Sequence, residues 1–505
     1  MTANAYEGLS AYFGDIHNHN NIGYGHGSLA DSFHNARLQL DFMAVTPHAY
    51  WPDLPVEDER LADLVAYHQR GFERTREQWS TVREVVEANY EPGKFVTFLA
   101  FEWHSLEYGD HNVYFNGAEG DIIYAANLEK MREALRAYQS QGIDCMVLPH
   151  HIGYKQGFRG VNWSAFTPEF SPLVEIMSMH GASESDSAPY PYLHTMGPRD
   201  WHSLYQYGLE LGHLVGVMGS TDHHSAHPGS YGHGRMLVWA KELNRESIWE
   251  AMQARCTVAL TGDNIQVKLA VNGRPIGSLA PASANRQIAV SVEGGGEIDY
   301  VEVIHNNRIL HRWQPRFESN KGPVKLHLEV GWGREGIDED WDVDLRVLGG
   351  DLLGVEPRFR GHEIVDPQAT EQLKYAFSNW TRVDDQSVHF TTRTWGNLTT
   401  TTPSTQGICL TIMPGEDTAV RVVANGVKQD ISLSELLAGP YSFYLNGFMT
   451  PAVYLHRAVP NQEWSGSFEI THQAEGLQRD WYYVRVRQTN GQWAWSSPVW
   501  VMPSI

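Results

Sequence analysis

Six short apolar runs in the first half of the chain each end in a residue that can bind a metal ion. They are YFGDIHNH (12–19), LDFMAVTPH (40–48), FVTFLAFEWH (95–104), CMVLPHH (145–151), LVEIMSMH (173–180) and LVGVMGSTDHH (214–224). Continuous runs rich in Val, Ile, Leu and Phe are typical of parallel strands buried on both faces. The pattern therefore predicts six buried strands with polar side chains at their carboxyl ends.

Helical patterns separate several of these runs. The spacing of apolar residues predicts helices over 56–90, 128–141 and 244–255. Strands that alternate with helices are typical of a parallel α/β barrel. In such barrels the functional residues lie at the carboxyl ends of many strands at once. Residues 1–264 are therefore predicted to form an α/β barrel that carries the active site.

The second half, residues 265–505, has a different pattern. Its runs are short and alternating, or rich in aromatic and β-branched residues, as in IQVKLAVNG, DYVEVIHNN and WYYVRVRQ. Turn signals such as Asn272-Gly273 separate them. This pattern predicts an antiparallel β region, in the form of a sandwich that is either one domain or two. The run TTTTPST (399–405) is predicted to be a loop or a boundary.

Composition indicates a soluble globular protein of two or three domains. The chain has 505 residues, 42% of them hydrophobic and 19% charged, and it has no apolar run long enough to span a bilayer. The first residues lack both a basic start and a continuous apolar stretch, so no secretory signal is expected and the cytoplasm is the expected compartment. Three scattered cysteines, Cys145, Cys256 and Cys409, form no disulfide framework.

The formal net charge of −22 bears on the class of partner. This charge repels nucleic acid and anionic membranes, so neither is expected as a partner. A small-molecule substrate is expected instead, and it can be anionic because bound metal ions outweigh the global charge at a site. The β-rich half is expected to cover or shape the active site, or to mediate assembly into a homo-oligomer.

Histidines are concentrated in the first half, where 18 of the 25 precede residue 236. His17 and His19 are one residue apart, a spacing that turns both rings to the same side of a strand. Asp222 and His224 repeat it, and Glu102 lies between two large aromatic residues, where an unpaired carboxylate is costly to desolvate. Two further runs end in His150 and His180. Each residue alone is more often structural, but six strand ends in sequence favour a metal site.

These residues resemble the hallmarks of the PHP (polymerase and histidinol phosphatase) superfamily, which are an HxH, a T-D-H type second motif and a late D-x-H. Here the motifs read His17-Asn18-His19, Thr46-Pro47-His48 and Asp222-His223-His224. Pro47 replaces the usual aspartate, a change expected to affect the orientation of His48 more than its metal binding. Over roughly residues 10–264, the resemblance implies a distorted (β/α)7 barrel with up to three metal ions.

The resemblance also implies three ligand sets. The first ion would take His17, His19, Glu102 and Asp222, the second Glu102, His150 and His180, and the third His26, His48 and His224. His151 and His223 are alternatives to their neighbours. The segments PHHIGY, GDHNVYF, GSTDHH and AWSSPVWV are similar to a branch of the superfamily whose members are mostly of unknown function.

An amidohydrolase barrel is the nearest alternative, because it would also use an HxH, two intermediate histidines and a late aspartate. His48 and His224 favour the PHP interpretation, since together they provide for a third ion.

Imidazole and carboxylate ligands are typical of Zn, Mn or Fe, and two or three such ions would lower the pKa of a bridging water toward ~7. Asp222 is predicted to be catalytic because it would hold the ions that activate this water. The general acid is expected among four histidines, with His111 preferred: His104, His111, His227 and His233. The residues expected to contact an anionic substrate are Lys155, Arg159, Arg235, His151 and His223.

Three functions are compatible with this sequence. Hydrolysis of a phosphoester leads, because a cluster of metal ions can hold a phosphate. Hydrolysis of a carboxylic ester, carbamate or amide by the same site is second. It is close to the first because a phosphate substrate would usually need several nearby cations, and the sequence offers few near the ligands. The third is a metal-stabilised scaffold that binds carbohydrate or protein through exposed aromatic residues of the β-rich half, namely Trp481, Tyr482, Trp493 and Trp495.

Overall fold

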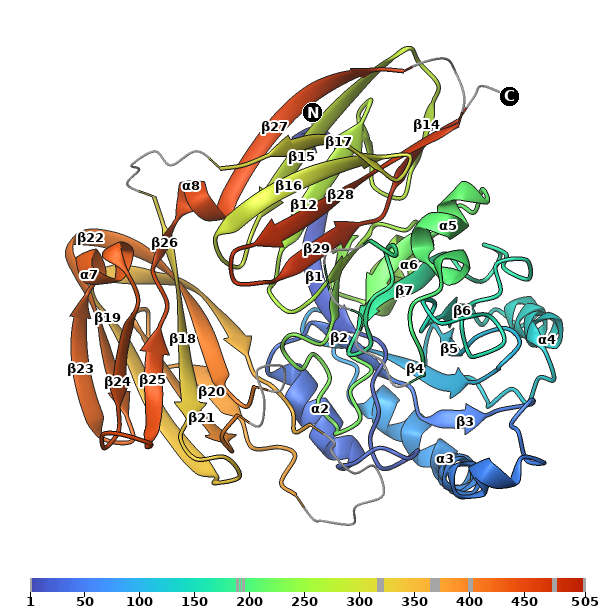
Figure 1. Ribbon diagram of the computed structural model, residues 1–505, viewed down its shortest axis with the longest axis horizontal. Coiled ribbons are helices and arrows are strands. Elements are labelled where there is room, and N and C mark those ends of the chain that lie inside the picture. The colour runs from blue at the N-terminus through green and yellow to red at the C-terminus, as the bar shows by residue number, and fades with distance from the viewer. Residues whose placement is uncertain are drawn as a thin grey trace.

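The computed structural model describes residues 2–187, 190, 192, 196–315, 322–363, 373–397, 403–474 and 479–502. Figure 1 shows an α/β part formed by the first half of the chain and two β parts formed by the second half. The predicted combination of α/β and β structure is therefore confirmed. Part of the predicted loop 399–405 lies outside the described residues.

Each of the six predicted strand runs contains or overlaps a strand. They are β1 (Ser10–Asp15), β2 (Phe42–Val45), β4 (Val96–Trp103), β6 (Cys145–Pro149), β7 (Leu173–Ser178) and β9 (Gly216–Gly219). Every residue of the last five is buried. The predicted helices are also present, as α3 (Ala62–Ala88), α4 (Leu128–Ser140) and α6 (Arg245–Gln253). Two shorter helices join them, α2 (Leu29–Arg37) and α5 (Tyr205–Glu210).

The sheet of the first half is only partly parallel, which corrects the sequence prediction. The pairs β1–β2, β2–β4 and β7–β9 are parallel. In contrast, β5 (His111–Phe115) runs antiparallel to both β4 and β6, and β10 (Arg235–Ala240) runs antiparallel to β1. Only residues 104–110 connect β4 to β5, and a parallel pair would need a crossover of a dozen or more residues.

The ladder of backbone hydrogen bonds does not close into a barrel over the described residues. It runs from β11 (Thr257–Leu260) through β10, β1, β2, β4 and β5 to β6, while β7, β9 and β8 (Gly181–Ala182) form a separate sheet. Side chains join the two sheets: Thr257 Oγ1 donates to Val217 O at 2.6 Å, and Val217 N donates to Ser497 Oγ at 3.0 Å. The strand ends of both sheets face the same region.

The chain does not break structurally at residue 264. Strand β11 pairs antiparallel with β29 (Trp493–Ser496), so the sheet of the first half continues into the second. There β28 (Asp480–Gln488), β16 (Ile298–His305), β17 (Arg308–Trp313), β30 (Val499–Met502) and β14 (Leu279–Pro281) extend it. A four-stranded sheet faces these strands, made of β13 (Arg274–Pro275), β12 (Gln266–Val271), β15 (Asn285–Glu293) and β27 (Ser465–Gln473). We call this pair of layers the sandwich; Val290, Val303 and Val484 lie in its core.

A second β unit with its own core is inserted between β17 and β27. It has nine strands: β18 (Val324–Trp332), β19 (Glu339–Arg358), β20 (Asn379–Arg382), β21 (Ser387–Thr394), β22 (Gln406–Ala424), β23 (Val427–Ser432), β24 (Tyr441–Tyr444), β25 (Pro451–Leu455) and β26 (Val459–Pro460). Its hydrophobic cluster is separate from that of the sandwich. We call residues 324–460 the inserted unit; it is the separate group of strands at the left of Figure 1.

The inserted unit contacts the loops of the first half. His34 of α2 contacts Ser378 O at 2.9 Å through Nε2, Trp380 Nε1 donates to Leu38 O at 2.8 Å, and Ser225 Oγ donates to His362 O at 2.7 Å. These contacts fix the inserted unit beside the segment that follows β9.

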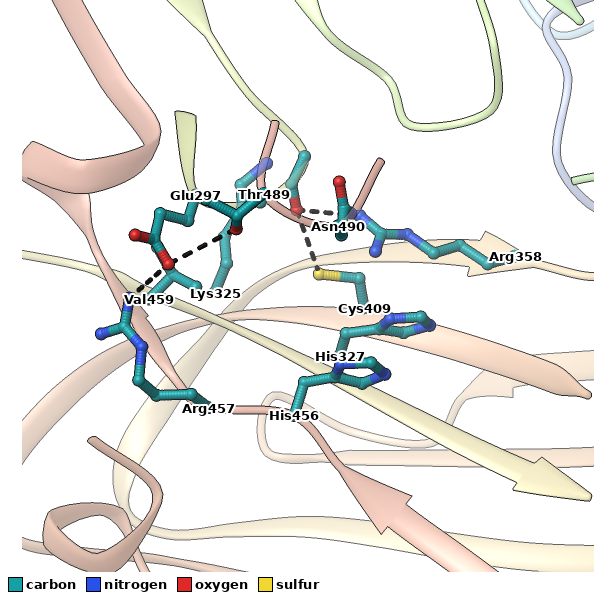
Figure 2. Close-up of a pocket in the computed structure, with 12 residues that line it drawn as sticks. Glu297, Lys325, His327, Arg358, Cys409, His456, Arg457, Val459, Thr489 and Asn490 are labelled. Carbon is teal, nitrogen blue, oxygen red and sulfur yellow. Dashed lines mark hydrogen bonds and ion pairs between the residues drawn. The ribbon is translucent and has the colours of Figure 1, made fainter. Parts of the chain in front are cut away.

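A cavity of about 200 Å³ lies where the inserted unit meets the sandwich (Figure 2). Its charged side chains are paired with one another or with the main chain. Arg457 Nη2 lies 2.7 Å from Glu297 Oε2, and Lys325 Nζ donates to Gly294 O at 2.7 Å. Arg358 pairs with Asp263 at 3.2 Å. The cavity is thus a polar joint between the two β units.

The four aromatic residues that the scaffold hypothesis named are buried, which corrects its premise. Trp481 and Trp493 are 9% and 4% exposed, and Tyr482 and Trp495 are fully buried. They anchor the sandwich and present no aromatic surface for carbohydrate or protein. Among the helices of the described residues, none combines the length and apolar character needed to cross a membrane.

Candidate metal centre

The segments that follow β1 and β9 lie side by side and bring distant ligands together. Asp222 N donates to His17 O at 2.7 Å, and His19 N donates to His223 O at 2.8 Å. Asn18 and His223 form a parallel bridge between these hydrogen bonds. Alternation along the segment after β1 turns the side chains of His17 and His19 to one side, and the backbone of Asp222, with φ at 53°, brings its carboxylate to both rings.

The carboxylate of Asp222 is the first centre of the cluster. Its Oδ1 lies 3.0 Å from His19 Nε2 and 3.1 Å from His17 Nε2. Its Oδ2 lies 2.6 Å from His180 Nε2 and 3.6 Å from His151 Nε2. One carboxylate therefore faces four imidazoles from three different strand ends.

The carboxylate of Glu102 is the second centre. Its Oε1 lies 3.0 Å from His150 Nε2 and 3.3 Å from His104 Nδ1. Its Oε2 lies 3.3 Å from His19 Nε2 and 3.4 Å from His48 Nε2. The register of β3 (His48–Tyr50) on β4 places His48 opposite Glu102. Because His19 faces both carboxylates, the two centres form one continuous cluster.

Several ligand atoms at the middle of this cluster are buried and make no hydrogen bond to the residues that the structure describes. They are His17 Nε2, Glu102 Oε2 and Asp222 Oδ2. Both carboxylates are 1% exposed and His17 is fully buried, so leaving these atoms unpaired is costly. Imidazole nitrogen and carboxylate oxygen are the donors that Zn, Mn and Fe accept. The arrangement therefore fits bound divalent ions.

Groups of three or more donor side chains that could each hold one ion are found throughout the cluster. They include His17, His19 and Glu102; His19, His48 and His224; His48, Glu102 and His104; His151, His180 and Asp222; and Glu102, Asp110, His150 and His151. The groups overlap, so neighbouring ions would share carboxylates.

Electrostatics at the cluster favour charged carboxylates. Burial alone would raise the pKa of Asp222, but His17 and its neighbours hold it well below its ordinary value of 3.8. Burial would also raise the pKa of Glu102. His104, His48 and His150 outweigh this effect and hold that pKa well below 4.5. Burial lowers the pKa of His48 and of His151 well below 6.5. Ionised carboxylates and neutral imidazoles are the forms that bind metal.

Three residues that sequence reasoning missed support the cluster. Glu175 Oε2 accepts from His17 Nδ1 at 2.7 Å, Asp110 contacts His104 and Arg159, and the ring of Tyr24 stacks on that of His48 with centroids 3.3 Å apart. Glu175 could have been recognised, because it is the lone charged residue of a buried strand. Asp110 and Tyr24 lie in loops and carry no comparable signal.

The contact of Glu175 with His17 fixes the position of one proton. A carboxylate oxygen accepts at this contact, so Nδ1 is the ring nitrogen of His17 that donates to Glu175, and Nε2 is the one that faces the cluster. A carboxylate that orients a histidine in this way also raises its basicity as a ligand.

We therefore expect Glu175→Gln to weaken metal binding by about 10- to 100-fold, the usual effect of losing such a partner. Competition with a chelator of known affinity would measure it. Glu87→Gln, on a partly exposed carboxylate that pairs with Arg245, is the control and should bind metal normally. Equal affinities in Glu175→Gln and the wild type would contradict the assigned role.

Not all predicted ligands join the cluster as expected. His180 contacts Asp222 rather than Glu102, and it is accompanied by His151, whose ring lies 3.9 Å from that of His180. The ring of His224 lies 4.3 Å from that of His19. His26 meets this region through its main chain, with N donating to His224 O at 2.7 Å, and its ring lies near Tyr375 of the inserted unit.

His111 lies on the wrong face of its strand for the predicted role of general acid. Register pairs Trp103 with His111 and Glu102 with Asn112, so it is Asn112 that shares the face of Glu102. The ring of His111 packs edge-on against Trp103, and its Nδ1 contacts Gly109 O at 2.9 Å. The register of β5 on β4, which the sequence pattern does not reveal, explains the difference.

His104 and Arg159, in contrast, lie at the cluster. Arg159 Nε donates to Asp110 Oδ2 at 2.6 Å, and its Nη2 lies 3.0 Å from His104 Nδ1. The same Nδ1 lies 3.3 Å from Glu102 Oε1 and 3.4 Å from Asp110 Oδ2, and Nε2 faces Tyr24 Oη at 3.4 Å.

The remaining predicted residues point elsewhere. Lys155 is exposed, and Arg235 is fully buried with Nη2 donating to Gly229 O and to Gln39 Oε1, both at 2.7 Å. His223 turns toward Ser225 and stacks near His233, which pairs with Glu363 at 3.1 Å. His227 is fully buried next to Phe377. These contacts are those of structural residues.

Comparisons with known proteins agree on similarity over part of the chain. A family described as a protein of unknown function (DUF3604) matches residues 50–188, the segment that contains Glu102, His150 and His180. An uncharacterised protein of Chlamydia trachomatis serovar D is 28% identical over 173 residues, which are 31% of this chain and 28% of that protein. An uncharacterised protein of Chlamydia pneumoniae is 25% identical over 264 residues, 47% of this chain and 41% of that protein.

The matched segments thus cover less than half of these relatives. Among solved structures, a two-domain protein of Bacteroides vulgatus that contains a predicted PHP-like metal-dependent phosphoesterase is similar, with a TM-score of 0.30 and 14% identity. That similarity covers 84% of this chain and 96% of the other.

Proposed function

We propose that this chain is a metal-dependent hydrolase that acts on a phosphoester of a small molecule and belongs to the PHP type of distorted barrel. The observation that carries the proposal is the convergence of buried imidazole nitrogens on the carboxylates of Glu102 and Asp222, with His17 Nε2 and Glu102 Oε2 making no hydrogen bond to the described residues. The HxH and D-x-H motifs that supply these atoms support the same reading.

Two or three divalent ions, Zn, Mn or Fe, would be held by the cluster. His17, His19, His48, Glu102, His150, His151, His180, Asp222 and His224 would be the ligands. When bound, the ions would supply hydroxide at neutral pH and stabilise negative charge that develops on the substrate.

The protein's own groups would handle the leaving group and the substrate charge. His104 lies at the cluster, with Nε2 beside Tyr24 Oη and Nδ1 toward the carboxylates of Glu102 and Asp110, so in its imidazolium form it is our candidate general acid in place of His111. Arg159 is the guanidinium that faces this histidine, and its Nη1 donates to Met196 Sδ, a weak acceptor, at 3.2 Å. Those N–H groups are suited to an oxygen of an anionic substrate.

Hydrolysis of a carboxylic ester, carbamate or amide is the second candidate, and one contact favours it. Asp110 pairs with Arg159 through both Nε and Nη2, so the positive charge of Arg159 is largely compensated. A neutral carbonyl substrate would need no further cation than the metal ions.

The deciding experiment combines metal analysis with parallel assays. The protein is purified without chelator, its metal per chain is measured by elemental analysis, and it is assayed on aryl phosphate mono- and diesters beside aryl carboxyl esters and carbamates. Two to three ions per chain with phosphoester turnover are expected. Turnover of carbonyl esters alone would favour the second candidate, and a chain that binds no metal would overturn both.

Substrate charge separates the two candidates further. We expect Arg159→Met to lower kcat/KM for a phosphate monoester by about 10- to 100-fold, the loss of 1.5–3 kcal/mol that a charge-assisted hydrogen bond contributes. Turnover of a neutral ester should change much less. Lys155→Met is the matched comparison, because that ammonium is exposed to solvent. Equal losses for both substrates would assign Arg159 to folding of the site instead of charge recognition.

A further inference from the structure

We propose that the sandwich is a working part of the metal centre: Arg485, Tyr483 and Trp495 hold Glu184 and thereby position His180. The inference rests on the proposed metal centre and adds positioning residues that lie about three hundred positions further along the chain.

His180 lies at the turn of a very small hairpin. Strand β8 has two residues and pairs with the end of β7, Met177 with Ala182 and Ser178 with Gly181. Ser183 N donates to Ile176 O at 2.7 Å, which ends the pairing. Strand β7 is held by its pairing with β9, but β8 is a two-residue edge strand of this sheet over the described residues, so contacts outside the sheet must fix the segment that follows His180.

Glu184, four residues after His180, provides that contact. Its carboxylate is fully buried, and the donors that meet it among the described residues belong to β28 and β29. Tyr483 Oη donates to Oε1 at 2.7 Å, Arg485 Nη1 donates to both oxygens at 3.1 and 2.9 Å, and Trp495 Nε1 donates to Oε2 at 2.9 Å. All three donors belong to the sandwich, and they satisfy a charge that would otherwise be costly to bury.

The donors are themselves fixed. Arg485 Nε and Nη2 donate to Glu302 Oε2 at 2.9 and 2.6 Å, so this guanidinium bridges a carboxylate of β16 and one of the hairpin. Gln206 Nε2 donates to Tyr483 Oη at 2.8 Å, and Gln206 N donates to Glu184 O at 3.0 Å. The side chain and the main chain of Glu184 are thus held at the same place.

The far end of the hairpin meets the metal cluster. His180 Nε2 is 2.6 Å from Asp222 Oδ2, and His180 Nδ1 is 2.9 Å from Tyr154 Oη. A shift of the hairpin by a fraction of its own width would separate His180 from Asp222. Loss of the contacts at Glu184 should therefore first lower the affinity for the ion that His180 is proposed to bind.

The test compares Tyr483→Phe, Arg485→Met and His180→Ala with the wild type, using metal per chain and the absorption spectrum of the cobalt-substituted protein. Arg485→Met should lose about one ion per chain, as His180→Ala should. Tyr483→Phe should lower the affinity for that ion by about 10-fold, within the range for residues that orient metal ligands. Both cobalt spectra should move toward that of His180→Ala. Arg312→Met is the control: that residue contacts Glu302 but not Glu184, and it should leave metal content and spectrum unchanged.

Circular dichroism and the thermal midpoint establish that each variant is folded. Should Arg485→Met fail to fold, the milder Tyr483→Phe decides the question. A folded Tyr483→Phe with the affinity and cobalt spectrum of the wild type would overturn the positioning role while leaving the metal centre intact. A wild-type chain without metal would instead overturn the proposed function on which this inference rests.

Discussion

Asp222→Ala should abolish hydrolysis and empty the larger part of the metal cluster. Asp222 faces His17, His19, His180 and His151, so one substitution removes the oxygen atoms on which all four converge. We expect turnover to fall about a thousandfold or more, the scale on which deleted catalytic groups act. Elemental analysis and steady-state assays on one preparation would measure both effects.

Asp15→Asn is the matched control for Asp222→Ala. Asp15 is an equally buried carboxylate nearby, but its oxygens accept from Thr221 and from Gly229 N instead of facing the imidazoles. This control should lose stability and keep its metal. An Asp222→Ala protein that retains full metal content and turnover would remove the cluster from the mechanism.

Asp263→Asn should cause the second large effect, a loss of stability. Asp263 lies at the junction of the three parts of the fold. The fully buried carboxylate accepts from Tyr231 Oη at 2.7 Å, Gln488 Nε2 at 2.6 Å and Asn490 Nδ2 at 2.9 Å, and it pairs with Arg358 of the inserted unit at 3.2 Å. Removing one partner of a buried ion pair costs about 3–5 kcal/mol. The thermal midpoint should therefore fall markedly.

The same pair predicts a dependence on pH. Burial alone would raise the pKa of Asp263, but Arg358 and the hydrogen-bond donors hold it below the ordinary value of 3.8. A carboxyl group with a lowered pKa in the folded state contributes fully above its unfolded pKa and loses this contribution as the pH falls. The stability difference between wild type and Asp263→Asn should be constant above pH 3.8 and shrink below it.

Asp340→Asn serves as control for this prediction. Its partner Arg393 lies at 2.8 Å, but the carboxylate is 77% exposed, and such pairs contribute about 0–1 kcal/mol. If Asp263→Asn lost as little stability as Asp340→Asn, the junction would not depend on the pair of Asp263 and Arg358.

Much of the cluster could be predicted because strand ends leave a strong local signal. An apolar run that stops at His17-Asn18-His19, or at Asp222-His223-His224, shows both the strand and the side on which its ligands lie. Glu102 was recognisable for a related reason, since a lone carboxylate among aromatic residues needs a partner. These inferences use information within ten residues.

What could not be predicted depends on contacts between distant segments. The role of His111 turns on the register of β5 against β4, and the pairing of His180 with Asp222 turns on how two separate sheets approach. Glu184 illustrates the limit most clearly, because its partners follow it by about three hundred residues. Nothing in SMHGASESD distinguishes it from an exposed loop residue.

The insertion of a complete β unit between β17 and β27 separates the two halves of the sandwich in time as well as in sequence. A ribosome that adds about 5–20 residues per second needs roughly 15–60 s to pass from His180 to Arg485. During that interval the histidines and carboxylates of the first half have been synthesised, but the strands that anchor the hairpin of His180 have not. With the positioning role proposed for Glu184 and its partners, the proposed metal centre would be complete only after β28 and β29 have been made, late in synthesis.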